Sequence, residues 1–309
     1  MANMEVICKI CQLKFDNDSS FHSHLKSHKI RQAEYYQTHY PRYDKFDKTI
    51  IKYKNKEQYF NTEFNSRSSF KNWILSASLI TAESYTKDVL LKRKEKGKIK
   101  FAPTQVELKT MMMPGMKFIN DKIKNYNNFC KELGLEIKFL KQSLDEGNFK
   151  DITNKYIFTD SREQKALEFD NRTRVKGMSF GDYRMKGSSI YIERKSINDA
   201  WGTLTGGYER FEREIVRAKE AEGYLVILVE GSFNELEKFP TQRQVYGKIK
   251  IPVEFLYHNI RELCQKYNHI QFLFVKNREE ASRVIQKIFA ADEQVKDVDL
   301  QYLYDIGQL

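Results

Sequence analysis

The second half of the chain alternates between short apolar runs and longer amphipathic segments, and this rhythm constrains the fold more than any other feature. Two runs, at 224–229 and 270–275, are almost wholly apolar, as expected of strands buried on both faces of a sheet. The other strand candidates and the helical patterns lie at 156–159, 189–192, 208–221 and 278–289. We therefore predict an α/β domain over residues 151–309 with a mixed central sheet.

A short N-terminal segment holds cysteines and histidines at a spacing typical of a metal site. Two residues separate Cys8 from Cys11, twelve separate Cys11 from His24, and three separate His24 from His28. Thiolates and imidazoles suit tetrahedral Zn²⁺, and a unit of residues 1–30 has too little core to fold without the ion. The segment resembles a Cys-Cys-His-His zinc finger, which implies a ββα fold with Zn²⁺ bound.

Three ring side chains of this segment carry separate predictions. Phe15 and Phe21 occupy the two apolar positions of a finger core, with Phe21 where leucine is usual. His22 lies off the ligand spacing, so we predict it at the surface. A single finger covers about three base pairs and would bind DNA weakly alone. Fingers also bind proteins, and the sequence leaves both kinds of partner open.

Positive charge is concentrated in the first half of the chain. Residues 1–150 hold 28 Lys and Arg against 17 Asp and Glu, whereas residues 151–309 hold 25 of each, so the first half carries the whole net charge of +11. This asymmetry is expected where one region neutralises DNA phosphates and another performs chemistry. We predict an aromatic-rich connecting region at 31–70 and a basic helical DNA-binding region at 71–150.

The strongest basic run of the chain follows a helical pattern at 70–96, and Gly97 is the expected helix end. Its candidate DNA contacts are Lys92, Arg93, Lys94, Lys96, Lys98 and Lys100. A solvated helix terminus explains the same run without DNA.

Two further helices are predicted after this run. Thr104 and Glu107 have capping-box spacing behind Pro103, the pair Pro114-Gly115 ends that helix, and a second apolar pattern from Ile119 ends at Gly134. The pair is similar to the helical DNA-binding repeats attached to homing endonucleases. Pairs of amphipathic helices also occur in many proteins that do not touch DNA.

Charged motifs follow the strand candidates of the second half. They are Asp160-Ser161-Arg162-Glu163, Gly181-Asp182-Tyr183, Glu193-Arg194-Lys195 and Asp199. Phosphodiester cleavage needs hard cations that activate water and neutralise charge, and carboxylates are the natural ligands of Mg²⁺ or Mn²⁺. We assign Asp182 and Glu193 as the metal ligands. Taken singly, each motif could be an ordinary charged surface run.

Strand alternation adds a geometric expectation around Glu193. Glu193 and Lys195 would share one face of a strand, so that the carboxylate holds metal while the ammonium orients water or the scissile phosphate. Arg194 would point the other way, with its backbone carbonyl within reach of the metal.

Together the four motifs resemble the signature of XPF-type nucleases, which have the restriction-enzyme-like PD-(D/E)XK fold, over roughly residues 155–290. The resemblance implies a DNA endonuclease whose catalytic set also includes Asp160 and Glu163. It implies supporting roles for Arg162, which would position a carboxylate or phosphate, and for Asp199, which would contact the site or cap the next segment. In the helix at 208–221, Arg210, Arg213 and Arg217 could face DNA, a partner or solvent.

Composition places the chain in a cellular class. No run of 18 apolar residues occurs and the start lacks the layout of a secretory signal, so we expect a soluble intracellular protein, in the cytoplasm or nucleoid of a bacterial host if it is phage-borne. Cys130 and Cys264 lie in apolar helical patterns and are predicted as buried thiols.

The expected substrate is double-stranded DNA. XPF-type enzymes usually add a tandem helix-hairpin-helix module after the nuclease, and none follows residue 289 here. We therefore hypothesise a site-directed, homing-type duplex endonuclease of a phage or mobile element. The alternatives are a structure-specific flap or junction nuclease and a DNA-binding protein with a retired catalytic domain. A double-strand break would need a homodimer or two visits.

Overall fold

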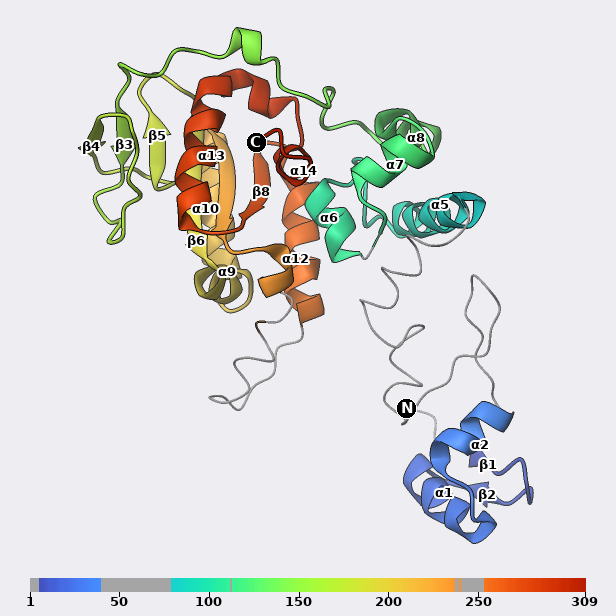
Figure 1. The fold of residues 1–309 in the computed structure, drawn as a ribbon. Helices are drawn as coiled ribbons and strands as arrows, with labels where there is room; N and C mark the ends of the chain where they lie inside the picture. The colour runs from blue at the N-terminus through green and yellow to red at the C-terminus, as the bar shows by residue number, and fades with distance from the viewer. Residues whose placement is uncertain (1–5, 40–78, 112, 237–238, 240–252) are drawn as a thin grey trace. The chain divides into compact units, whose positions relative to one another are not determined.

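The computed structural model describes residues 6–39, 79–111, 113–236, 239 and 253–309, and it divides into two compact units, Met1–Tyr85 and Thr86–Leu309 (Figure 1). The part of the predicted connecting region from residue 40 to 70 lies outside the described residues. None of the helices in the described ranges is long and apolar enough to cross a membrane.

The N-terminal unit is a small ββα fold, as predicted. An antiparallel hairpin of β1 (Val6–Ile7) and β2 (Lys14–Phe15) is followed by α1 (Asp18–His24), by a 3₁₀ turn, η1 (Leu25–His28), and by α2 (Gln32–His39). Asn17 caps α1 because its side chain accepts a hydrogen bond from the Ser20 amide. Phe21 is buried and Phe15 packs against it, so the predicted aromatic core is confirmed.

Two features of this unit were not predicted. Helix α2 lies beyond residue 30 and contributes Tyr35 and Tyr36 to the same core. The prediction of His22 at the surface was wrong: its side chain is half-buried, and Nε2 lies 2.9 Å from the Tyr36 hydroxyl. The reason is α2, which covers a helix face that a bare finger leaves open.

The larger unit is built on one mixed sheet of six strands. Its spatial order is β4 (Thr173–Val175), β3 (Ile157–Thr159), β5 (Tyr183–Met185), β6 (Ile190–Ser196), β7 (Tyr224–Glu230) and β8 (Ile270–Val275). Strand β5 is antiparallel to both neighbours, whereas β6, β7 and β8 are parallel to one another. The mixed sheet and four of its strands were predicted. The other two, β4 and β5, are short and carry an arginine at their centre, so neither forms an apolar run.

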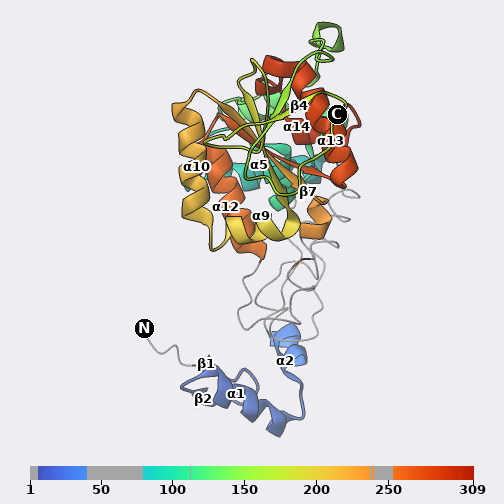
Figure 2. The same cartoon turned by 90° about the vertical axis from the view of Figure 1, so that its left-hand side faces the viewer.

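Helices cover both faces of the central strands (Figure 2). One core joins α9 (Ile197–Leu204), α10 (Tyr208–Glu220) and α12 (Val253–Lys266) to one face of β7 through Leu225, Ile227 and Val229. Helix α13 (Arg278–Ala291) also packs on β7 and β8, but its residues are not part of this core. The last helix, α14 (Leu300–Asp305), closes the outer edge of β8, because the Gln301 side chain accepts a hydrogen bond from the Phe274 amide at 2.7 Å.

From Thr86 onward the middle helices belong to this larger unit, whereas residues 79–85 of the first helix fall in the smaller unit. The middle helices are α5 (Leu79–Glu95), α6 (Gln105–Thr110), α7 (Met116–Lys122) and α8 (Tyr126–Glu132), and short 3₁₀ turns lie at Glu146–Asn148 and Asp292–Lys296. Five of the six residues of α6 are buried, Val106 lies in the core that covers the sheet, and the Gln105 amide donates to the Asp299 carboxylate at 2.7 Å. Helix α6 therefore has no free face to place in a DNA groove.

The predicted signals that start and end these helices are mostly present. Thr104 and Glu107 form the capping box, and Gly97 ends α5 at φ 64°. The predicted single helix from Ile119 to Gly134 is instead two, because Asn125 breaks it and caps α8 by accepting from the Asn128 amide. The thiols of Cys130 and Cys264 are buried, as predicted.

Candidate active site

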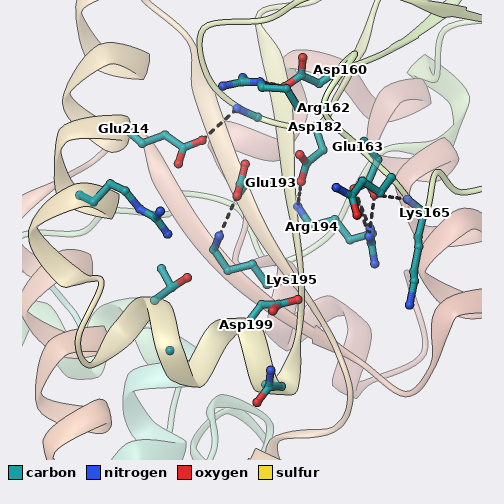
Figure 3. Close-up of a pocket in the computed structure, with 16 residues that line it drawn as sticks. Asp160, Arg162, Glu163, Lys165, Asp182, Glu193, Arg194, Lys195, Asp199 and Glu214 are labelled. Atoms are coloured by element: carbon teal, nitrogen blue, oxygen red, sulfur yellow. Dashed lines mark hydrogen bonds and ion pairs between the residues drawn. The ribbon is translucent and has the colours of Figure 1, made fainter.

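Strand β6 carries the central pair of the site. The Lys195 ammonium lies 2.7 Å from Glu193 Oε1 (Figure 3). It also lies over the Phe211 ring of α10, 4.8 Å from the ring centroid. Glu193 is only 8% exposed. The alternating pattern of the strand therefore places a carboxylate and an ammonium together at the edge of a hydrophobic core.

Asp182 is placed beside this pair by a glycine turn. Gly181 adopts φ +69°, and a Cβ at this position would lie 3.2 Å from the Tyr191 side chain and 3.3 Å from the Ile192 carbonyl oxygen. The turn lets Asp182 pair with β6: its amide donates to the Ile192 carbonyl at 2.7 Å, and its Oδ2 accepts from the Arg194 amide at 2.7 Å. A larger residue at 181 would displace the acid from the strand.

The two acids share a poorly solvated site that disfavours their charged forms. Burial, followed by the charge of Glu163, raises the pKa of Asp182 to about 6, although the Arg194 amide opposes the shift. Burial also raises the pKa of Glu193 to about 8, with Lys195 opposing and Asp182 and Glu214 adding to the rise. Such a site favours a further positive charge.

Asp160 and Arg162 form a second pair at the end of β3. The Asp160 amide donates to the Asp182 carbonyl at 2.8 Å, which ties the two acidic turns together. Its carboxylate accepts from Arg162 Nε at 2.8 Å and from the Met178 amide at 3.2 Å. Burial raises the pKa of Asp160, but these hydrogen bonds outweigh it and hold the pKa below its ordinary value. Asp160 is therefore a charged, already partnered carboxylate.

Glu163 is held by the arginine of β6. Arg194 donates from one nitrogen to both Glu163 oxygens at 3.0 Å and from another to Glu230 at 3.0 Å. All three side chains are at most 13% exposed. The predicted catalytic Glu163 thus lines the cleft with both of its oxygens held by Arg194, in the geometry of a structural clamp.

Asp199 lies in the first turn of α9. The Ser196 hydroxyl caps this helix by accepting from the Asp199 amide at 3.1 Å and donates to the Asp199 carboxylate at 2.7 Å. Asp199 also lines the cleft. Ser196 is thus the residue that caps α9, and the Asp199 side chain contacts this cap while it lines the cleft.

Sequence reasoning missed one carboxylate of the site, Glu214 of α10. Its Oε1 accepts from the Gly181 amide at 3.2 Å, next to Asp182. In Figure 3 the Glu193 side chain lies between those of Asp182 and Glu214. Its spacing of four residues from Arg210 puts both on one helix face, but nothing in the sequence places that face against the sheet.

A cleft of about 710 Å³ joins these groups. Every acidic and basic residue predicted for the catalytic centre lines it, as does Arg210 of the α10 arginine row. Arg213 and Arg217 are exposed, and Arg217 donates to the Ser179 carbonyl at 3.2 Å.

A family model described as the ERCC4 domain matches residues 117–288. The chain belongs to the ERCC4 domain family. The match includes α7, α8 and all six strands of the large sheet, so the ERCC4 domain begins within the predicted basic region. Membership of this family agrees with the resemblance to XPF-type nucleases that the four motifs carry.

Solved structures similar to this ERCC4 protein include XPF from Aeropyrum pernix. Its complex with DNA is 22% identical with a TM-score of 0.35, and the match covers 44% of this chain and 64% of that one. A second structure of the same XPF is also 22% identical, with a TM-score of 0.34, and the match covers 46% of this chain and 68% of that one. The chain thus spans about two thirds of the length of these relatives. No curated protein sequence matches it significantly.

Outside the ERCC4 domain, the four predicted metal ligands of the N-terminal unit converge. The donor atoms of Cys8, Cys11, His24 and His28 all lie within 4.8 Å of one another. Cys8 Sγ is 3.5 Å from His28 Nε2, and Cys11 Sγ is 3.1 Å from His24 Nε2. Two thiolates and two imidazoles at these separations fit a tetrahedral Zn²⁺ ion.

The basic run is divided between contacts and solvent. The Lys94 ammonium donates to the Leu133 carbonyl at the end of α8, at 2.8 Å, and Lys100 lies 3.2 Å from Glu136. Lys92, Lys96 and Lys98 are exposed, whereas Arg93 is half-buried. Five of the six predicted DNA contacts are therefore exposed, and two of these five, Lys94 and Lys100, also contact a carbonyl or a carboxylate of the protein.

Proposed function

We propose that this protein is a metal-dependent DNA endonuclease. The observation that carries the proposal is a pair of carboxylates beside Lys195: half-buried Asp182, directly before β5, and buried Glu193, within β6. Burial raises the pKa of both acids, and neighbouring carboxylates add to the rise: Glu163 for Asp182, and Asp182 and Glu214 for Glu193. A bound divalent cation would offset both effects. Membership of the ERCC4 family supports the same reaction class.

Asp182 and Glu193 are the residues that would hold Mg²⁺ or Mn²⁺, because their oxygen donors suit hard cations. When bound, the ion would activate water and neutralise charge on the phosphate. Lys195 lies close enough to Glu193 to orient the water or the scissile phosphate from the same face of β6. The hydrophobic ring of Phe211 beneath the ammonium limits its rotation.

The surrounding groups would keep this arrangement in place. Arg194 clamps Glu163 and Glu230 and thereby fixes β6 against the loop that follows β3. Asp160 joins that loop to the Asp182 turn. Arg162 keeps 69% of its side chain exposed while it contacts Asp160, so it is placed to meet a DNA phosphate.

Plasmid cleavage with Mg²⁺ tests the proposal. We expect wild type to nick or linearise the plasmid, while Glu193→Ala and Lys195→Ala do not, although both still bind it. The matched control is Glu220→Gln, on the exposed side of α10, which should cut like wild type. If no variant cuts any duplex or branched substrate and all bind DNA equally, the retired DNA-binding protein replaces the enzyme.

The finer proposal concerns the substrate. We infer a site-directed, homing-type endonuclease of duplex DNA, with the N-terminal unit as a zinc finger that adds duplex contacts. The burial of α6 removes one support for it, because that helix cannot read a groove. Competition with a random duplex pool should leave one cut site preferred. Cleavage of flaps or junctions far above any linear duplex would instead establish the structure-specific alternative.

Strand cleavage raises the question of assembly. One active site can cut one strand at a time, so a double-strand break requires a homodimer or two visits. Light scattering with and without DNA, combined with the ratio of nicked to linear product, separates the two routes.

A further inference from the structure

The N-terminal unit contains a buried tyrosine that the zinc-finger spacing does not account for. Tyr35 lies on α2, seven residues after the last predicted ligand, and its side chain is completely buried. Its ring packs edge-on against Phe21 with centroids 5.1 Å apart, and against Tyr36 at 5.6 Å. A residue outside the ββα fold thus fills the centre of its core.

The Tyr35 hydroxyl reaches the turn between the two cysteines. It accepts a hydrogen bond from the Lys9 amide at 2.8 Å, and Lys9 lies directly after Cys8. This hydrogen bond ties the turn that carries the first predicted ligand to the buried ring of α2.

Helix α2 makes a second polar contact, on the other side of the core. The Tyr36 hydroxyl lies 2.9 Å from His22 Nε2, and the two rings meet edge-on at 5.8 Å. His22 is not one of the converging ligands. The adjacent tyrosines thus have different tasks: one contacts the cysteine turn, and the other contacts α1.

We propose that Tyr35 is a positioning residue of the Cys8, Cys11, His24 and His28 site, and that residues 31–39 are part of the metal-binding module. This rests on the zinc binding proposed above. The hydroxyl holds the cysteine turn so that both thiolates face the two imidazoles. Hydrogen bonds to metal ligands and to their backbone orient the ligands, and their loss typically weakens metal binding about 10- to 100-fold.

The test uses the full-length chain loaded with zinc. Tyr35→Phe keeps the buried ring and removes only the hydroxyl, while Tyr36→Phe makes the same change at the neighbouring residue. Zinc content is measured first, then the rate of zinc transfer to a chelating dye, and finally the thiolate charge-transfer band of the cobalt-substituted protein. We expect Tyr35→Phe to release zinc at least 10-fold faster with a shifted cobalt band, and Tyr36→Phe to stay within twofold of wild type.

Three outcomes would overturn the inference, and they are distinguishable. If the wild-type protein contains no zinc, the proposed metal site itself is wrong. If wild type holds one zinc and Tyr35→Phe releases it at the same rate, zinc binding stands and the role of Tyr35 does not. Equal acceleration by both variants would indicate general loosening of the core. Plasmid cleavage reports separately on the nuclease, because Tyr35 lies outside the ERCC4 domain.

Discussion

Glu193→Gln should remove a specific pH dependence from the stability of the larger unit. The pKa of Glu193 is raised from 4.5 to about 8 by burial and by the neighbouring acids. Between these two values the folded chain keeps a proton that the unfolded chain has released. The raised pKa therefore favours the fold at low pH, and this contribution is lost as the pH rises through about 8.

The expected size follows from the two pKa values. Proton linkage for a single carboxyl with these values makes wild type less stable at pH 9 than at pH 6 by about 2–3 kcal/mol. For a unit of this size, that corresponds to a fall in Tm of about 5–10 °C. Divalent cation should reverse much of the loss in wild type, because the ion replaces the proton between the acids.

The assay is thermal unfolding at pH 6, 7, 8 and 9, in EDTA and in excess Mg²⁺. Glu193→Gln should show a shallower pH slope in EDTA and a much smaller response to Mg²⁺, while the exposed control Glu220→Gln keeps the wild-type behaviour. Because slopes are compared, a uniform cost from losing the Lys195 contact cancels. A Glu193→Gln protein with the slope and the Mg²⁺ response of wild type would refute the electrostatic reasoning.

Three further predictions follow from the same geometry. Lys195→Ala should lower kcat for plasmid cleavage at least 100-fold, in line with about 10²–10³ for loss of one preorganised donor, while the DNA Kd in a filter-binding assay stays within a few-fold. Glu214→Gln removes a charge that raises the pKa of Glu193. At limiting Mg²⁺, the pH at which cleavage activity rises should therefore be lower than in wild type. A pH–activity profile identical to that of wild type would contradict the role of Glu214. Replacing Lys92, Lys96 and Lys98 together by alanine should reduce the slope of log Kd against log salt by about 3 if all three contact phosphates, and an unchanged slope would assign them to solvent.

The sequence alone was sufficient for features that depend on neighbouring residues. The apolar runs of β7 and β8 are recognisable because a strand that is buried on both faces consists almost wholly of apolar residues, and this composition is visible in the strand's own sequence. The capping box of α6 and the helix end at Gly97 are likewise set by hydrogen bonds and dihedral angles within a few residues. The finger spacing was readable because one ion imposes fixed distances on its four ligands.

Tertiary structure decided the features that depend on distant residues. Glu214 joins the cleft because α10 packs on α9 and β7, which brings its side chain to the Gly181 amide. Arg194 meets Glu163 and Glu230 only once three separate segments of the chain are assembled. The same holds for α6, whose composition permits an exposed helix but whose faces are buried by α12 and α14. In the local sequence, Tyr35 is only one of several aromatic residues after the finger, and its contact with the cysteine turn appears only in the folded unit.

The division between the two has a physical reason. Periodicity, capping and ligand spacing are short-range properties, so each leaves a pattern in the local sequence. The pKa of Glu193, the partners of Arg194 and the position of α2 arise from side chains brought together by packing, and a raised pKa in particular depends on burial that no single segment provides. The sequence therefore determined which residues could perform the chemistry, and the fold decided which of them meet.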